Sequence, residues 1–176
     1  MSPARKACGA LSDMPNWCDS DLCVIGSAAE VERFVNGLKF SEREGEGAEF
    51  SILDSYYPMP EELKSVISGH GPHAGDNGAW MCEVQEDGSN VERPFTPEEV
   101  KTLKEKYGCL SWYDWCVNHW DTKWSDSTTV VTTSATSVKM RMNTPWSPPL
   151  KGLLEVSKKF PKLKFRISYY ERGMAY

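Results

Sequence analysis

Four side chains that bind transition metals occur in two pairs with the same spacing. Cys116 and His119 are three residues apart, as are His70 and His73. Thiolate and imidazole groups are common ligands of tetrahedral zinc, so the four could form one site. No Cys-x-x-Cys pair accompanies them, and the two pairs come from unrelated segments. We therefore predict no metal and no cofactor, with a buried thiol beside a hydrogen-bonded imidazole; a zinc site is the alternative.

The same cysteine and histidine could form a catalytic triad. Cys116 would be the nucleophile, His119 the base, and Asp114 or Asp121 the third member. Side chains three residues apart on one helix rarely point at each other, and both aspartates fall on the opposite side of the predicted helix. We therefore predict no catalytic residues and a protein that is not an enzyme.

Acidic side chains gather in the loop that reads SEREGEGAE. Between residues 30 and 62 there are nine acids and three bases, whereas residues 151–172 carry seven bases and two acids. Closely spaced carboxylates can imitate a run of phosphates and occupy a basic groove on another protein, although such a loop is more often simply solvated. The predicted partner-binding residues of this acidic face are Glu42, Glu44, Glu46 and Glu49.

Basic and aromatic side chains occupy outward positions of two predicted strands near the end of the chain. An open antiparallel sheet with this composition can bind a single-stranded nucleic acid through phosphate contacts and base stacking. A solvated sheet face often has the same composition, and the chain lacks the aromatic cluster of RNP motifs. The candidate nucleic-acid-binding residues are Lys139, Arg141, Lys164, Arg166 and Tyr170.

The stretch SWYDWCVNHWDTKW holds four of the seven tryptophans. On a helical wheel Trp112, Trp115 and Trp120 fall on one side. Each buried indole removes about 150–250 Å² from water, so we expect these rings to stabilise the core and leave charge patches as the only outward-facing chemistry. An aromatic binding platform is the alternative, and Trp124 and Trp146 lie in predicted loops, where an exposed edge is possible.

The elements that position these side chains alternate between strands and helices. They are a strand over 17–26, a helix capped by Ser27 and Glu30, a strand over 50–60, a short helix over 61–68, a helix from Thr96 to Gly108, the tryptophan helix, a hairpin over 126–144, a helix capped by Ser147 and ended by Pro161, and a strand over 163–172. Without its helical insertion this order is close to β-α-β-β-α-β. The fold class is therefore α+β, with a ferredoxin-like antiparallel sheet and helices on one face.

Length and composition fit one soluble domain. We expect a loose N-terminal extension over 1–13 and a single ferredoxin-like domain over 14–176, with the insertion at about 58–124. No apolar run approaches the ~20 residues that cross a bilayer, and no secretory signal begins the chain. Six cysteines without such a signal fit reduced thiols. We predict a cytoplasmic protein that contacts no membrane.

Five motifs occur in an order that resembles the YubB-type ferredoxin-like domain family of phage and plasmid proteins. They read MPNWC, PMPEEL, YGCLSWYDWCVNHWDTKW, WSPP and FPKLKFRISYYERGM. The resemblance covers nearly the whole chain from Met14 onward. It implies the ferredoxin-like fold and an origin on a mobile element, and it implies no particular activity.

Together these observations favour a non-catalytic accessory protein that acts by binding a macromolecule. The expected partner is a host protein or protein–nucleic-acid complex with a basic surface, inhibited through the acidic face in the manner of anti-CRISPR or anti-restriction proteins. Direct binding of single-stranded nucleic acid on the sheet is the alternative. It is less favoured because a net charge of −5 opposes broad contact with phosphates.

Overall fold

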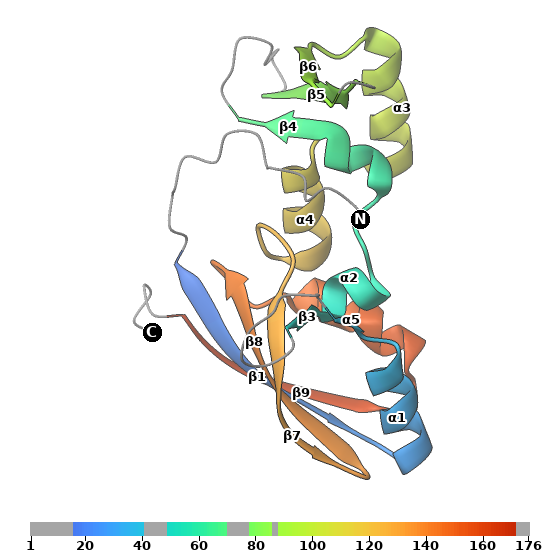
Figure 1. Cartoon of the computed structure of the whole chain (residues 1–176), viewed down its shortest axis with the longest axis vertical. Helices are drawn as coiled ribbons and strands as arrows, with labels where there is room; N and C mark the ends of the chain where they lie inside the picture. The colour runs from blue at the N-terminus through green and yellow to red at the C-terminus, as the bar shows by residue number, and fades with distance from the viewer. Residues whose placement is uncertain (1–15, 41–48, 70–77, 86–87, 172–176) are drawn as a thin grey trace.

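The computed structural model describes residues 16–40, 49–69, 78–85 and 88–171. Its main sheet has six strands in the order β2-β3-β7-β8-β1-β9, and all of its neighbouring strands are antiparallel (Figure 1). These strands are β1 (Trp17–Ile25), β2 (Lys39–Phe40), β3 (Phe50–Ser51), β7 (Ser127–Ser134), β8 (Ser137–Pro145) and β9 (Lys164–Glu171).

Four of these strands and two helices form a β-α-β-β-α-β unit. The unit runs β1, α1 (Ala28–Asn36), β7, β8, α5 (Leu150–Lys159) and β9, and its strands lie side by side as β7-β8-β1-β9. Figure 1 shows α1 and α5 on the same side of the sheet. The predicted ferredoxin-like α+β fold is confirmed.

Alternation along the strands separates a core face from an open face. On β1, Leu22 and Val24 are buried, and on β8 so are Val138, Met140 and Met142, as the sequence predicts. They pack against side chains of α1 and α5 in one hydrophobic cluster. Within the described ranges no helix covers the opposite face, so the intervening side chains are exposed or partly exposed.

Two predicted helix caps differ from the structure. Ser27 is the N-cap residue of α1, but its side chain makes no capping hydrogen bond, and the Glu30 carboxylate binds Arg33 at 2.8 Å. The last helix begins at Leu150 instead of directly after Ser147, whose hydroxyl donates to the carbonyl oxygen of Asp121.

The predicted strand over 50–60 is also wrong beyond its first two residues. The chain leaves the sheet after β3 and forms α2 (Ile52–Tyr56). Ser51 caps this helix by accepting from the Asp54 N–H at 2.9 Å. The buried carboxylate of Asp126 accepts from the N–H groups of Ile52 and Leu53 at 3.0 and 2.9 Å. A hydrogen-bond partner more than seventy residues away in the sequence therefore stabilises a helix here instead of a strand.

The segment between α2 and β7 contains the predicted helices and also a second sheet. Its elements are η1 (Glu61–Ser65), β4 (Val66–Ser68), β5 (Ala79–Val84), β6 (Asn90–Arg93), α3 (Pro97–Tyr107) and α4 (Trp112–Trp120). The predicted helix over 61–68 is a short 3-10 helix followed by β4. Strands β4-β5-β6 form a small antiparallel sheet at the top of Figure 1, with α4 between it and the main sheet. The sequence analysis missed the β5–β6 hairpin.

The tryptophan helix α4 builds a second hydrophobic cluster. Trp115 and Trp120 are buried with Cys116, and they pack against Leu53 of α2 and Leu63 of η1. The Trp120 indole N–H donates to the carbonyl oxygen of Tyr57 at 3.0 Å. The core interpretation therefore holds for these two rings.

None of the helices in the described ranges is long and apolar enough to cross a membrane. None of the cysteines in these ranges forms a disulfide. The predicted extension over 1–13 lies outside the described residues.

Candidate nucleic-acid interface

The open face of the main sheet brings β8 and β9 against the two edges of β1. Cys23, two residues before the end of β1, pairs with Lys139 on β8 and with Arg166 on β9. Side chains directly opposite on adjacent strands have Cβ atoms about 4.5–5.5 Å apart. The strand register therefore places one cation on each side of the small, partly exposed side chain of Cys23.

Toward the start of β1 the open face carries acidic and aromatic side chains. Asp21 pairs with Arg141, and their side chains form an ion pair at 3.7 Å. Asp19 pairs with Tyr170, whose ring is 60% exposed. The cations Lys139, Arg166 and Lys164 thus gather toward one end of the strands, and carboxylates and an aromatic ring gather toward the other.

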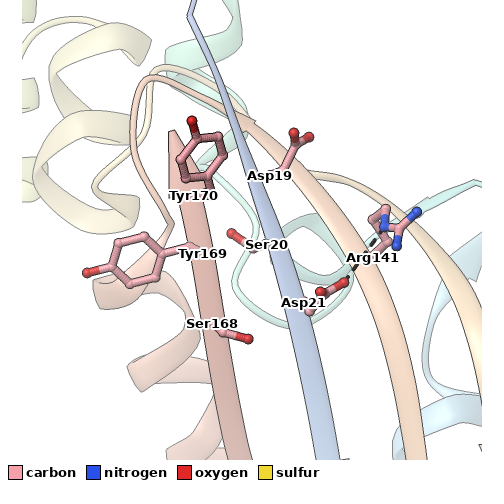
Figure 2. Close-up of a pocket in the computed structure, with 7 residues that line it drawn as sticks. All are labelled: Asp19, Ser20, Asp21, Arg141, Ser168, Tyr169 and Tyr170. Atoms are coloured by element: carbon pink, nitrogen blue, oxygen red, sulfur yellow. Dashed lines mark ion pairs between the residues drawn. The ribbon is translucent and has the colours of Figure 1, made fainter. Parts of the chain in front are cut away.

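A pocket of about 380 Å³ lies at this second end. Figure 2 shows Tyr170 and Ser168 of β9 beside Asp19 and Asp21 of β1, with Arg141 on the far side of β1. Tyr169 lines the rim of the pocket but points away from β1. Its volume falls in the range of small-molecule sites. Its lining residues are Asp19, Ser20, Asp21, Arg141, Ser168, Tyr169 and Tyr170.

All five residues predicted for nucleic-acid binding lie on this one face. Lys139 and Arg141 point outward from β8, and Lys164, Arg166 and Tyr170 from β9, and each is exposed. The sequence analysis missed the carboxylates of β1, which the strand pairing inserts between them. The alternation of buried and polar residues in DSDLCV predicted which side chains point outward, but not which strands flank them.

The acidic-face hypothesis concerns residues that are mostly outside the described ranges. Glu42, Glu44 and Glu46 lie there, while Glu49 is exposed directly before β3. The strands on either side of these residues in the sequence, β2 and β3, form the edge of the main sheet opposite β9. The acidic face therefore stays a prediction.

The cysteine and histidine of α4 have structural partners. The Cys116 thiol contacts the Met59 sulfur at 3.8 Å, and burial raises the pKa of Cys116 to about 12. His119 stacks on Trp115 and its Nδ1 lies 3.0 Å from the Tyr57 hydroxyl. A thiol with so high a pKa is neutral at physiological pH and is a poor nucleophile.

The structure tests the aspartates of the triad hypothesis but not the second histidine pair of the metal hypothesis. His70 and His73 lie outside the described ranges. Asp114 accepts from the Ser111 hydroxyl at 2.8 Å, and Asp121 binds Lys151 at 2.7 Å. Among the described residues, no three His, Cys, Asp or Glu side chains are grouped so that they could hold a metal ion.

The prediction that tryptophans are sequestered is wrong for part of the set. Trp80 is buried like the two rings of α4, but Trp17 is 42% and Trp146 40% exposed, and Trp112 and Trp124 are partly exposed. Charge patches are therefore not the only outward-facing chemistry. Trp17 begins β1, and Trp146 directly follows the last residue of β8.

The C-terminal third of the chain matches a protein family. Residues 119–176 match the model of the family described as a ferredoxin-like domain in Api92-like proteins. The matched span includes β7, β8, α5 and β9, and so the basic and aromatic residues of the open face. Searches of curated proteins and of solved structures found no match. The family match supports a ferredoxin-like domain family.

Proposed function

We propose that this protein binds single-stranded nucleic acid on the open face of its main sheet. One observation carries the proposal: the strand register gathers exposed cations, an exposed tyrosine and a pocket on a sheet face that no described helix covers. Antiparallel sheets of β-α-β-β-α-β proteins bind single strands in this manner. The nucleobases stack on aromatic rings, and basic side chains hold the phosphates.

The division of charge along β1 suggests how a strand lies on the face. Phosphates are attracted to the end with Lys139 and Arg166 and repelled from the end with Asp19 and Asp21. A base stacked on Tyr170 would present its edge to those carboxylates, which accept hydrogen bonds from exocyclic amino groups such as that of cytosine. The face therefore suits a single strand with accessible base edges, and a duplex poorly.

Reversing the charge at the cationic end tests the proposal. In the double variant Lys139→Glu, Arg166→Glu, we expect affinity for a labelled single-stranded oligonucleotide to fall strongly, measured by fluorescence anisotropy at low salt. If both cations contact phosphates, the slope of log affinity against log salt should also become shallower by about 1.4.

A matched variant controls for the change in net charge. Lys101→Glu, Lys104→Glu alters two exposed lysines of α3, on the far side of the small sheet, and should leave affinity nearly unchanged. Equal losses in both double variants would mean that only net charge matters. No binding by the wild-type protein at low salt would refute the proposed function.

The resemblance to phage and plasmid proteins adds a proposal about biological setting. A mobile element would use such a protein either to hold single strands or, through the acidic loop, to block a host complex with a basic surface. Exposed Glu49 beside β3 supports the second use only weakly. Capture of a basic host partner that is lost when Glu42, Glu44, Glu46 and Glu49 become lysine would favour the acidic loop over the sheet.

A further inference from the structure

Trp146 has an unusual backbone conformation for a large side chain. Its φ angle is 72°, in the left-handed region, and its indole is 40% exposed. A bulky residue rarely adopts this conformation, because its Cβ crowds the following carbonyl group. Such residues persist where surrounding contacts hold them, and they cluster at ligand-binding sites.

Hydrogen bonds from several segments hold the backbone around Trp146. Its own N–H donates to the carbonyl oxygen of Asn16 at 2.7 Å. The buried hydroxyl of Thr122 donates to the carbonyl oxygen of Pro145 at 2.7 Å, and the buried Thr144 hydroxyl donates to that of Ser147 at 2.8 Å. None of these bonds involves the indole. These bonds fix the backbone of the loop that carries the ring.

The exposed indole belongs to a group of aromatic rings, which we call the aromatic ridge: Trp17, Tyr113, Trp124 and Trp146. Trp146 contacts Tyr113 edge-on with ring centroids 6.0 Å apart, and Trp17 contacts Trp124 in the same way at 6.2 Å. The Lys123 ammonium contacts one ring of each pair. It lies 5.3 Å from the centroid of the Trp124 ring and 4.9 Å from that of the Trp146 ring.

The aromatic ridge continues the open face of the main sheet. Trp17 is the first residue of β1, and it points outward like Asp19 and Asp21 because alternate residues share a face. It pairs with Pro145, the residue directly before Trp146. A path of exposed side chains therefore runs from the pocket beside Tyr170 along β1 to Trp17 and on to the loop that carries Trp146.

We propose that the aromatic ridge is a second stacking platform, which binds bases of a strand that extends beyond the sheet while Lys123 contacts its phosphates. The inference rests on the proposed function. Bases are the occupant that fits best, because every base offers a flat face for stacking and the lysine between the rings complements phosphate charge. The continuity with the pocket places this platform on the path of the same strand.

Two oligonucleotide lengths separate this platform from the sheet. We would titrate single strands of about 4 and about 12 nucleotides, the range that single-strand-binding domains cover. In the variant Trp146→Gly, affinity for the longer strand should fall about fivefold or more, which corresponds to the loss of one stacked base, while affinity for the shorter strand should not change.

The thermal midpoint of the same variant tests whether the indole is structural. Glycine adopts a positive φ freely, so the midpoint should stay the same or rise. A marked decrease in the midpoint would show that the ring stabilises the fold, and it would overturn the platform. Leu154→Ala, which removes a 58% exposed apolar side chain from α5, is the control and should affect neither strand.

The remaining outcomes distinguish the two proposals. If Trp146→Gly binds both strands like the wild type, the platform is refuted while the sheet interface stands. If the wild type binds neither strand, the proposed function fails and the platform fails with it. Capture of an apolar protein surface by the ridge in place of the longer strand would also contradict the platform.

Discussion

At the scale of single residues, Asp126 shows how one buried polar group organises several segments. Its carboxylate is 5% exposed and accepts four hydrogen bonds, from the N–H groups of Ile52 and Leu53 and from the hydroxyls of Ser51 and Thr128. Burial raises the pKa of this carboxyl group, while the four donors oppose that effect. The residue joins the start of β7 to α2, and so connects the main sheet to the second hydrophobic cluster.

Replacing this carboxylate should cost much more stability than replacing an exposed one. Asp126→Asn turns one acceptor oxygen into a donor that points at backbone N–H groups, and should lower the free energy of unfolding by about 2–4 kcal/mol. Urea denaturation measures the change. Asp54 is an exposed aspartate in the first turn of α2. The substitution Asp54→Asn should lower the free energy of unfolding by only a few tenths of the amount expected for Asp126→Asn. Equal effects of the two substitutions would refute this role of Asp126.

At the scale of elements, an ion-pair network joins both strands of the β5–β6 hairpin to α3. Arg93 on β6 binds Glu83 on β5 and Glu99 on α3, each at 2.6 Å. Glu99 also accepts from the Thr96 N–H at 2.8 Å and completes a capping box at the start of α3. The hydrogen bonds from Arg93, chiefly, lower the pKa of Glu99 from 4.5 to about 2.

This lowered pKa predicts how stability depends on pH. A carboxyl group with a depressed pKa in the folded state contributes stability that is complete above its unfolded value and disappears as the pH falls through its folded value. The window for Glu99 therefore runs from about 4.5 down to about 2. After allowance for solvent screening, Glu99→Gln should cost about 1–2 kcal/mol at neutral pH.

The difference between wild type and Glu99→Gln should shrink as the pH is lowered through that window, as measured by urea denaturation at each pH. Glu98→Gln in the same helical turn is the control and should show no such dependence. A constant difference between wild type and Glu99→Gln from neutral pH to pH 2 would contradict the assigned pKa.

The same elements show what could be predicted from the sequence. The alternation in β8 and the cap, proline and terminal glycine of α3 are local signals, and each was interpreted correctly. The α2 helix was missed because the carboxylate that binds its first N–H groups belongs to Asp126, directly before β7. The β5–β6 hairpin had a local signal in Asp87-Gly88, a common hairpin turn pair, and Gly88 does adopt a positive φ of 82°.

At the scale of the whole molecule, the candidate interface depends on strand order. The sequence places cations on β8 and β9, but only the order β8-β1-β9 brings them to either side of β1 and inserts Asp19 and Asp21. The left-handed backbone of Trp146 was equally inaccessible, because contacts with residues 16 and 122 fix the loop around it. Long-range pairing therefore determines most of the interface.

Alkylation of Cys23 tests the central claim most directly, because this thiol lies between Lys139 and Arg166 at the cationic end of the open face. The rate of its reaction with N-ethylmaleimide would be followed by mass spectrometry, with and without a saturating single strand. Cys82 on β5, also partly exposed, is the internal control. We predict that the bound strand slows alkylation of Cys23 severalfold and leaves Cys82 unchanged. Unaltered alkylation of Cys23, with binding confirmed in the same sample, would contradict binding on this face.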